Sequence, residues 1–322
     1  MILTRTPFRI SFSGGGTDLS VFYAVERGVV LATTIDKYIY IMVNRRFDRS
    51  IRVSYSRTEI VEHASRIEHP IVREALALLG IEHGLEIISM GDVPAQTGLG
   101  SSGSFTVGLL HALHAFRGEH PSAEQLAAEA CVIEIDRLRE PIGKQDQYIA
   151  AYGGFQRIQF NADERVDVEP LACAPGTLEA LNDRLLLCFT GITRSASEVL
   201  IEQQRDMSVT APQLAALADI AERMRTELLG TPRLGAFGEL LHESWMVKRR
   251  LSGVTSEAID RWYDRARQAG AIGGKLLGAG GGGFLLLFVE PGARDAVIGA
   301  LAPLQTLPFQ FAPAGSTVIY AE

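Results

Sequence analysis

The chain has 322 residues, 47% of them hydrophobic and 21% charged, and it carries a formal net charge of −7 at pH 7. This length accommodates two domains with separate cores, and the acidic balance argues against nucleic-acid binding, which usually needs a basic face. Three cysteines without a C-x-x-C pair indicate reduced thiols. The longest fully apolar run, Phe284 to Val289, is too short to span a bilayer. We therefore expect a cytoplasmic protein with no nucleic-acid or membrane partner.

The N-terminal part of the chain predicts a sheet followed by helices. Apolar runs separated by glycines and polar pieces predict strands at residues 9–12, 29–35, 38–43, 51–55 and 85–90. Phe105, Leu109, Leu113 and Phe116 then recur at spacings of three and four residues. This spacing predicts a long helix, which Gly118 ends.

A second helix is predicted from Ala123 to Arg139, ahead of Pro141. Beyond residue 180 the pattern changes, with a buried strand followed by mostly helical segments up to about residue 270. The further strands predicted there are Leu185–Phe189, Phe284–Val289 and Thr317–Tyr320. We expect two α+β domains, residues 1–180 and residues 181–322.

The most informative segment is the glycine- and serine-rich stretch at 91–104, which reads GDVPAQTGLGSSGS. It lies between a predicted strand and a predicted helix. Glycines let the backbone turn tightly and approach a ligand, and a helix start offers free N–H groups and the positive end of its dipole. Its Gly98-x-Gly100-x-x-Gly103 pattern also fits a dinucleotide fingerprint, but the second strand of that fold is missing. The segment therefore predicts a phosphate cradle of another kind.

Three further stretches contain candidate functional residues, and each also has an interpretation that involves no ligand. The N-terminal TPFRISFSGGGTDLS offers Arg9 as a fixed positive charge and Asp18 as an acceptor for sugar hydroxyls, or is a surface turn. Residues 273–284, GGKLLGAGGGGF, predict a close backbone approach to a ligand or to another segment, or a structural hairpin. Glu134 and Asp146, in EIDRLREPIGKQDQ, form a candidate carboxylate pair. Taken without the other stretches, this pair indicates only solvated surface carboxylates.

Taken together, the four stretches resemble the GHMP kinases, the family of galactokinase, homoserine kinase, mevalonate kinase and phosphomevalonate kinase. The middle motif of that family, P-x-x-x-G-L-G-S-S-[AG], is matched from Pro94 to Gly103, and the three family motifs occur in order between residues 6 and 284. The resemblance implies a two-domain α+β fold. Its N-terminal domain would hold a mixed sheet with helices and bind ATP, and its C-terminal domain would be a ferredoxin-like α/β sandwich.

Within this family the chain looks like the sugar 1-kinases. Arg9 and Asp146 match the arginine and aspartate that act on the anomeric hydroxyl in galactokinases, and Glu134 keeps the interval of the magnesium-holding glutamate. Thr17 and Asp18 match the sugar-binding T-D pair. The chain departs from galactokinases by reading GGGTD where they read GEHTD, which removes a negative charge and opens room for a larger or phosphorylated sugar.

The resemblance assigns the site residues as follows. Asp146, Arg9 and Lys144 are the expected catalytic residues, and Ser102 and Glu134 the expected Mg²⁺ ligands. The expected ATP-binding residues are Pro94, Thr97, Gly98, Leu99, Gly100, Ser101, Ser102, Gly103 and Ser104. The expected sugar-binding residues are Gly15, Gly16, Thr17, Asp18, Asp146, Gly280 and Gly281.

The GGGTD, TGLGSSGSF and GKQDQYIAAYGG strings resemble most closely the D-glycero-D-manno-heptose 7-phosphate kinases. This resemblance implies an ATP- and Mg²⁺-dependent kinase, a monomer or homodimer, that forms the 1,7-bisphosphate for nucleotide-activated heptose synthesis. Galactose, fucose or an octose phosphate are alternative substrates, and a catalytically silent sugar sensor is an alternative class. Lys144, Arg139 and Arg194 are candidate partners for the sugar's own phosphate.

Overall fold

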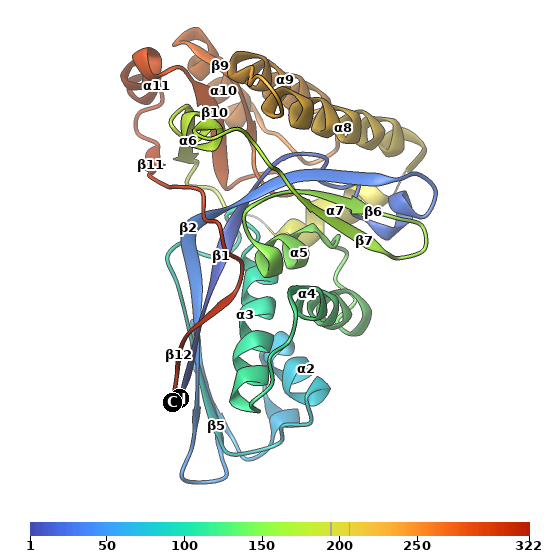
Figure 1. The fold of residues 1–322 in the computed structure, drawn as a ribbon, viewed down its shortest axis with the longest axis vertical. Coiled ribbons are helices and arrows are strands. Elements are labelled where there is room, and N and C mark those ends of the chain that lie inside the picture. Colours follow the sequence, from blue (N-terminus) through green and yellow to red (C-terminus); the bar gives the residue numbers. More distant parts are fainter. Residues whose placement is uncertain (194, 206) are drawn as a thin grey trace.

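The computed structural model describes residues 1–193, 195–205 and 207–322. These residues form two packed regions, each with its own sheet and helices (Figure 1). The strands are β1 (Ile2–Ser13), β2 (Gly28–Arg45), β3 (Ile51–Ser54), β4 (Thr58–Val61), β5 (Leu85–Gly91), β6 (Phe155–Phe160), β7 (Val166–Pro170), β8 (Leu185–Phe189), β9 (Ala271–Leu276), β10 (Phe284–Val289), β11 (Gln305–Leu307) and β12 (Thr317–Ala321).

The α-helices are α1 (Ser20–Tyr23), α2 (Pro70–Leu78), α3 (Ser101–Phe116), α4 (Ala123–Cys131), α5 (Gln145–Tyr152), α6 (Thr177–Asn182), α7 (Ala196–Gln204), α8 (Met207–Leu228), α9 (Leu234–Lys248), α10 (Glu257–Gln268) and α11 (Arg294–Ala300). Three short helices of other kinds are η1 (Ala64–Arg66), η2 (Val132–Arg137) and η3 (Pro291–Ala293). No helix in the described ranges combines the length and the apolar character that crossing a membrane requires.

The N-terminal sheet has eight strands, in the order β12-β1-β2-β5-β3-β4, with β6 and β7 joined to β2. The predicted strands at 29–35 and 38–43 are one continuous strand, β2, whose first part pairs with β6 and whose second part pairs with β5. The Asp36-Lys37 step, read as a break, is instead a shift in the pairing of β2 with β1, next to Arg9. A shift of this kind bends a strand without ending it.

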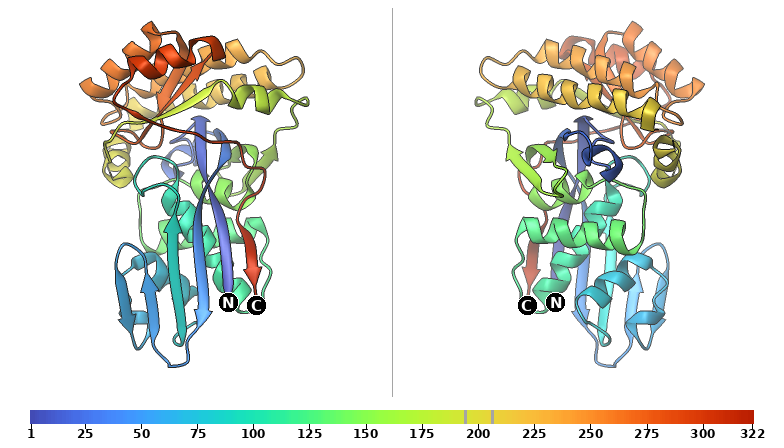
Figure 2. Two further views of the ribbon diagram at one scale, coloured as in Figure 1. Left: turned by 90° about the vertical axis from the view of Figure 1, so that its left-hand side faces the viewer. Right: turned by 90° about the vertical axis from the view of Figure 1, so that its right-hand side faces the viewer.

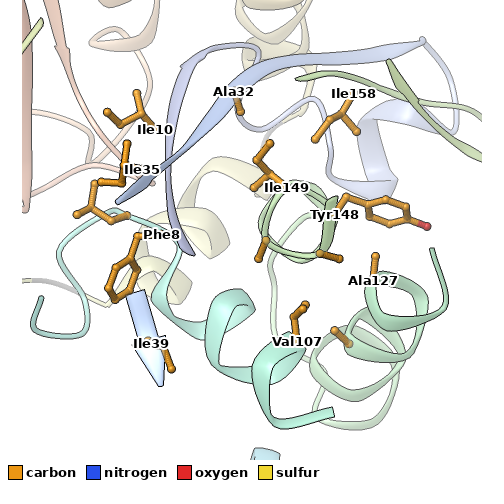
Figure 3. Close-up of a cluster of buried hydrophobic side chains, with 14 of the residues drawn as sticks. Phe8, Ile10, Ala32, Ile35, Ile39, Val107, Ala127, Tyr148, Ile149 and Ile158 are labelled. Carbon is orange, nitrogen blue, oxygen red and sulfur yellow. The ribbon is translucent and has the colours of Figure 1, made fainter. Parts of the chain in front are cut away.

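Helices α2 to α5 lie together on one side of this sheet, as the two side views show (Figure 2). Apolar side chains from β1, β2, α3, α4 and α5 meet between the sheet and the helices (Figure 3). The fully buried members include Phe8, Ile10, Ile35, Val107 and Ile149. Burial of a large apolar side chain contributes about 1.5–3 kcal/mol, so this core fixes where β1, α3 and α5 lie relative to one another.

The C-terminal region contains a second, antiparallel sheet in the order β11-β8-β10-β9. Helices join the first strand to the second and the third to the fourth. This is the β-α-β-β-α-β connection of a ferredoxin-like sandwich, so the predicted fold class is confirmed. Its separate core includes Trp245, Tyr263 and Leu287.

The last strand does not belong to the second region, to which the sequence assigned it. β12 pairs with the outer edge of β1, with Ile2 opposite Ala321 and Arg5 opposite Thr317. This pairing satisfies backbone groups that β1 would otherwise expose along its edge. The chain thus returns to the N-terminal sheet after β11, whereas the division between residues 180 and 181 stays a prediction.

Candidate active site

A pocket of about 400 Å³ lies between the N-terminal sheet, α3 and α5 on one side and residues of the C-terminal region on the other. Its lining joins segments that are far apart in sequence, and they include all four stretches that the sequence singled out. Those of the predicted site residues that line it are Arg9, Gly15, Gly16, Asp18, Gly98, Gly100, Ser101, Ser102, Gly103, Asp146 and Gly280.

An arginine–carboxylate pair is part of the pocket lining. Arg9, on β1, donates two hydrogen bonds to Asp146 in the first turn of α5, from Nε to Oδ1 at 2.8 Å and from Nη2 to Oδ2 at 2.9 Å. Its third contact is from Nη1 to the carbonyl oxygen of Gly98, at 2.5 Å. This two-point contact fixes both oxygens of the carboxylate, which a single-point contact would leave free to rotate.

The N-terminus of α3 opens into the same pocket next to this pair. Gly100 is the N-cap residue, with φ of 76°, and no side chain of the described residues caps the helix. A Cβ at Gly100 would lie 3.0 Å from Cγ of Arg9, and one at Gly103 would lie 2.9 Å from Cβ of Asp146. Glycine at these positions therefore lets the free N–H groups of α3 lie beside the carboxylate. This arrangement suits an anionic group held next to a proton acceptor.

A buried glutamate lies behind α3. The sequence predicted one helix from Ala123 to Arg139, but the chain changes after α4 into a single stretch of π-helix, η2. Such insertions are frequent at functional sites because they re-aim side chains. Here Glu134 contacts the Ser102 hydroxyl through Oε1 and accepts a 2.8 Å hydrogen bond from Nε2 of Gln147 through Oε2. The predicted pair Ser102 and Glu134 is thus in contact, and Gln147 is a partner that the sequence did not indicate.

Burial raises the pKa of Glu134 to about 7, against the opposing effect of its hydrogen bonds from Ser102 and Gln147. The folded protein therefore favours the protonated carboxyl, and the resulting stability is full below the ordinary pKa of 4.5 and lost as pH rises through about 7. The loss amounts to roughly 3 kcal/mol above pH 7.

We therefore expect Glu134→Gln, which mimics the protonated carboxyl, to raise the melting temperature of the ligand-free protein at pH 8 and to change it little at pH 5. Thermal unfolding at the two pH values measures this difference, with Glu26→Gln, at an exposed position, as the control. An equal effect of Glu134→Gln at both pH values would contradict the raised pKa.

The two glycine-rich loops pack against each other, as the sequence predicted for residues 278–283. A Cβ at Gly283 would lie 2.2 Å from the carbonyl oxygen of Thr97, and one at Gly278 would lie 2.6 Å from Cα of Gly98. The amide of Phe284 also donates to the Thr97 oxygen, at 3.1 Å. The C-terminal glycines thus support the loop that precedes α3.

Another wall of the pocket is formed by Gly15, Gly16, Asp18 and Gln145. The carboxylate of Asp18 is buried and accepts hydrogen bonds from the amides of Gly16, at 2.8 Å, and Gln145, at 3.1 Å. Burial raises the pKa of Asp18, partly offset by the Gln145 amide. Oε1 of Gln145 is buried and has no hydrogen-bond partner among the described residues. Gln145 is thus a pocket residue that the sequence analysis did not select.

Several predicted residues support the pocket without lining it. Lys144 contacts Glu164 and lies over the ring of Tyr23, 5.0 Å from its centroid, outside the pocket lining. The Thr17 hydroxyl donates to the carbonyl oxygen of Gly14, at 2.7 Å, and the Ser104 hydroxyl donates to that of Pro7, at 2.8 Å. The other predicted residues outside the lining are Pro94, Thr97, Leu99, Glu134 and Gly281.

Of the candidate partners for a sugar phosphate, Arg139 is exposed and outside the pocket lining, and Arg194 lies outside the described residues. The pocket instead contains two lysines that the sequence analysis left without a role, Lys248 and Lys275. Both are buried, and both donate to backbone carbonyl oxygens. Lys248 and Lys275 reach the pocket only because the C-terminal region packs against the N-terminal one. A local sequence motif does not predict that packing.

One other group of side chains has metal-ligand geometry, His63, Glu82 and His83, on the surface away from the pocket. Nδ1 of His63 accepts a hydrogen bond from the amide of Ser65, at 3.1 Å. The neutral ring therefore carries its proton on Nε2, the atom that faces Glu82. Coordination through Nε2 would displace this proton and break the Ser65 hydrogen bond, because only a deprotonated nitrogen binds a metal.

An open helix N-terminus beside an arginine-held carboxylate suits phosphoryl transfer to a hydroxyl group. Similarity to known kinases shows that the protein is a phosphotransferase with a hydroxyl acceptor. Comparison with known proteins identifies the family. Residues 69–154 match the GHMP kinases N terminal domain, and residues 224–303 match the GHMP kinases C terminal domain. The chain belongs to the GHMP kinase family, and ATP is the co-substrate of this family.

Among its relatives, the D-glycero-alpha-D-manno-heptose 7-phosphate kinase of Campylobacter jejuni is 30% identical, over 93% of each chain. A putative sugar kinase of Campylobacter jejuni has a solved structure that is 28% identical, with a TM-score of 0.79 over 98% of this chain and 97% of its own. A D-glycero-D-manno-heptose 1-phosphate kinase from Bacteriodes thetaiotaomicron shares the fold, with a TM-score of 0.83 at 24% identity over the full length of both chains.

Proposed function

We propose that the protein transfers the γ-phosphoryl group of ATP to the anomeric hydroxyl of D-glycero-D-manno-heptose 7-phosphate. The observation that carries the reaction is the Asp146 carboxylate, held by Arg9 next to the open N-terminus of α3. Support for the sugar comes from the heptose 7-phosphate kinase relative at 30% identity and from the open GGGTD turn.

The N-terminus of α3 is the proposed site for the ATP phosphates. The backbone N–H groups of residues 100–103 would surround them, with the dipole of α3 behind. The amide of Ser104, also expected at this site, donates instead to the carbonyl oxygen of Gly100, at 3.0 Å. Apolar side chains of Pro70, Ile71 and Leu138 line another part of the pocket and suit the adenine ring.

In the proposed reaction Asp146 accepts the proton of the anomeric hydroxyl while that oxygen bonds to the γ-phosphorus. The bond from the γ-phosphorus to the bridging oxygen breaks, and ADP leaves with the electron pair. Arg9 would stabilise the charge that develops on the transferred group and keep Asp146 aimed at the hydroxyl. Lys144, predicted as an alternative to Arg9, contacts Glu164 instead.

Ser102 and Glu134 are the proposed protein ligands of Mg²⁺. A hydroxyl and a carboxylate oxygen in contact are ligands that Mg²⁺ accepts, and no cationic side chain of the described residues forms an ion pair with Glu134. When bound, Mg²⁺ neutralises charge on the ATP phosphates.

We expect Glu134→Gln to raise the Mg²⁺ concentration for half-maximal rate by at least about tenfold, because a carboxylate ligand is lost. A magnesium titration of ATP turnover measures this, again with Glu26→Gln as control. An unchanged titration would remove Glu134 from the metal site, whatever the variant does to stability.

The turn at residues 14–18 is the proposed sugar wall. Gly15 stands where galactokinases have glutamate, and the nearest atoms to a Cβ there would be those of the Gln145 amide and the Ser11 hydroxyl, at 3.5–3.9 Å, which is ordinary contact. The missing side chain leaves room for a sugar that extends beyond a hexose. Gly16 differs, because a Cβ there would lie 2.8 Å from Leu214, so its glycine serves packing.

A substrate panel tests the proposed function. Heptose, galactose and fucose, the first two with and without a terminal phosphate, are supplied with ATP and Mg²⁺, and phosphorus NMR locates the new phosphate. We expect the highest kcat/KM for D-glycero-D-manno-heptose 7-phosphate, with the product a 1,7-bisphosphate. Preference for galactose or fucose would replace the substrate, and absence of ATP turnover with every sugar would favour the sensor alternative.

A further inference from the structure

Two buried lysines in the pocket have no anionic partner among the residues that the structure describes. Lys248, at the end of α9, donates from Nζ to the carbonyl oxygen of Leu276, at 3.2 Å, and to that of Gly278. Lys275, on β9, donates from Nζ to the carbonyl oxygens of Ser11 and Phe12, both at 2.9 Å. Among the described residues, no carboxylate lies within 4.0 Å of either ammonium group.

Burying a charge is costly unless an opposite charge accompanies it, and carbonyl dipoles compensate it only in part. Lys248 is 7% exposed and Lys275 is 2% exposed, and both line the pocket. The Asp146 carboxylate is already paired with the neighbouring Arg9, so it does not supply the missing negative charge. Burial lowers the pKa of Lys248 to about 7 and also lowers that of Lys275, with the charge of Arg9 adding to both effects.

In its charged form, each ammonium group also has one hydrogen-bond donor that the carbonyl oxygens do not use, so an anion bound there would favour the charged form. An ammonium has three N–H donors, and two carbonyl oxygens account for two of them on each lysine. The hydroxyl of Ser11 lies on the same wall, is buried, and has no partner among the described residues. When both lysines are charged, three donors without acceptors among the described residues thus face one cavity. Unsatisfied buried polar groups of this kind call for an external partner.

We infer that Lys248, Lys275 and Ser11 form an anion subsite that takes a phosphate group of one of the two reactants. This inference rests on the proposed function, because both reactants of a sugar-phosphate kinase carry phosphate. Two locations of that phosphate are compatible with the subsite. Gly278, whose carbonyl oxygen Lys248 holds, packs on Gly98 of the loop before α3, which is close to the proposed ATP phosphates. Ser11 lies on the proposed sugar wall beside Gly15.

Binding measurements with paired ligands identify the source of the phosphate. The probes are ADP against the non-hydrolysable analogue AMP-PNP, and D-glycero-D-manno-heptose against its 7-phosphate, titrated calorimetrically with Mg²⁺ present. Lys248→Met removes the charge and keeps much of the length. Lys37→Met is the control, since Lys37 pairs with Asp36 on β2 outside the pocket lining.

Loss of one hydrogen bond between charged groups weakens binding by roughly 10- to 100-fold. We expect Lys248→Met to raise the Kd of one phosphorylated probe by this factor and to leave its unphosphorylated or shorter counterpart within twofold. An effect on AMP-PNP and not on ADP assigns the subsite to the γ-phosphate. An effect on the 7-phosphate and not on the plain sugar assigns it to the substrate's own phosphate. Lys248→Arg should restore most of the affinity.

Ser11→Ala provides a second variant if Lys248→Met does not fold, because the Ser11 hydroxyl has no hydrogen-bond partner to lose among the described residues. Its expected effect on the same probe is roughly threefold to tenfold. Affinities within twofold of wild type for every probe, in folded variants, would overturn the inference. If the wild type binds nucleotide but neither heptose, the proposed substrate fails, and the same comparison is made with the sugar phosphate that the panel identifies.

Discussion

Asp146→Asn is expected to lower kcat by at least 10²- to 10³-fold while ATP still binds. The carboxylate is the one acceptor that Arg9 holds with two hydrogen bonds beside the open N-terminus of α3. An asparagine cannot take the hydroxyl proton, and its amide presents only one acceptor to Arg9. Removal of one well-placed group in a preorganised site typically costs about 3–4 kcal/mol of transition-state stabilisation.

Steady-state kinetics with saturating sugar phosphate measure the fall in kcat, and a separate nucleotide titration measures whether ATP still binds. Asp295→Asn, at an exposed position on α11, is the matched control and should leave kcat unchanged. Turnover of Asp146→Asn at the wild-type rate would remove Asp146 from the mechanism. Loss of nucleotide binding as well would indicate that the substitution disturbs the phosphate loop instead.

Gly283→Ala is expected to destabilise the protein strongly. The residue has φ of +96°, and a Cβ there would lie 2.2 Å from the carbonyl oxygen of Thr97. The backbone conformation alone costs a non-glycine residue about 1–3 kcal/mol, and the contact forces the loop before α3 to move. We therefore expect a fall of at least about 2 kcal/mol in the free energy of unfolding, with a raised KM for ATP.

Gly292→Ala is the control, since a Cβ at Gly292 has no atom within 4 Å and its φ is not positive. Chemical denaturation measures the stabilities of both variants, and ATP titrations measure KM. If Gly283→Ala were as stable as Gly292→Ala, the packing of the two glycine loops would be wrong. If it were destabilised without any change in KM for ATP, the C-terminal loop would not support the nucleotide site.

The sequence predicted well those features that local spacing determines. The glycines at 98, 100 and 103 predicted that the backbone approaches other groups closely. In the structure a side chain at any of them would crowd Arg9, Asp146 or the second glycine-rich stretch. The long helix α3 and the strands β1, β2, β3, β5, β8, β10 and β12 followed from apolar periodicity, whereas the strands β4, β6, β7, β9 and β11 were not predicted. The two-domain fold followed from the order of the family motifs and is confirmed by the match of both domains.

Features that depend on distant parts of the chain were missed. Lys248 lies on an ordinary amphipathic helix, and only the docking of α9 against the second glycine loop buries its ammonium group. Lys144 stood next to the predicted catalytic aspartate in sequence, but a helix start directs neighbouring side chains in different directions, and Lys144 meets Glu164 instead. The partners of β12 and the π-helical turn at Glu134 likewise depend on tertiary contacts.

The most direct test of the account is a crystal structure of the protein with AMP-PNP and Mg²⁺. The account predicts phosphate oxygens within hydrogen-bond distance of the backbone N–H groups of residues 100–103, with the Asp146 carboxylate facing the γ-phosphorus. A nucleotide bound elsewhere, with the N-terminus of α3 left open to solvent, would contradict it.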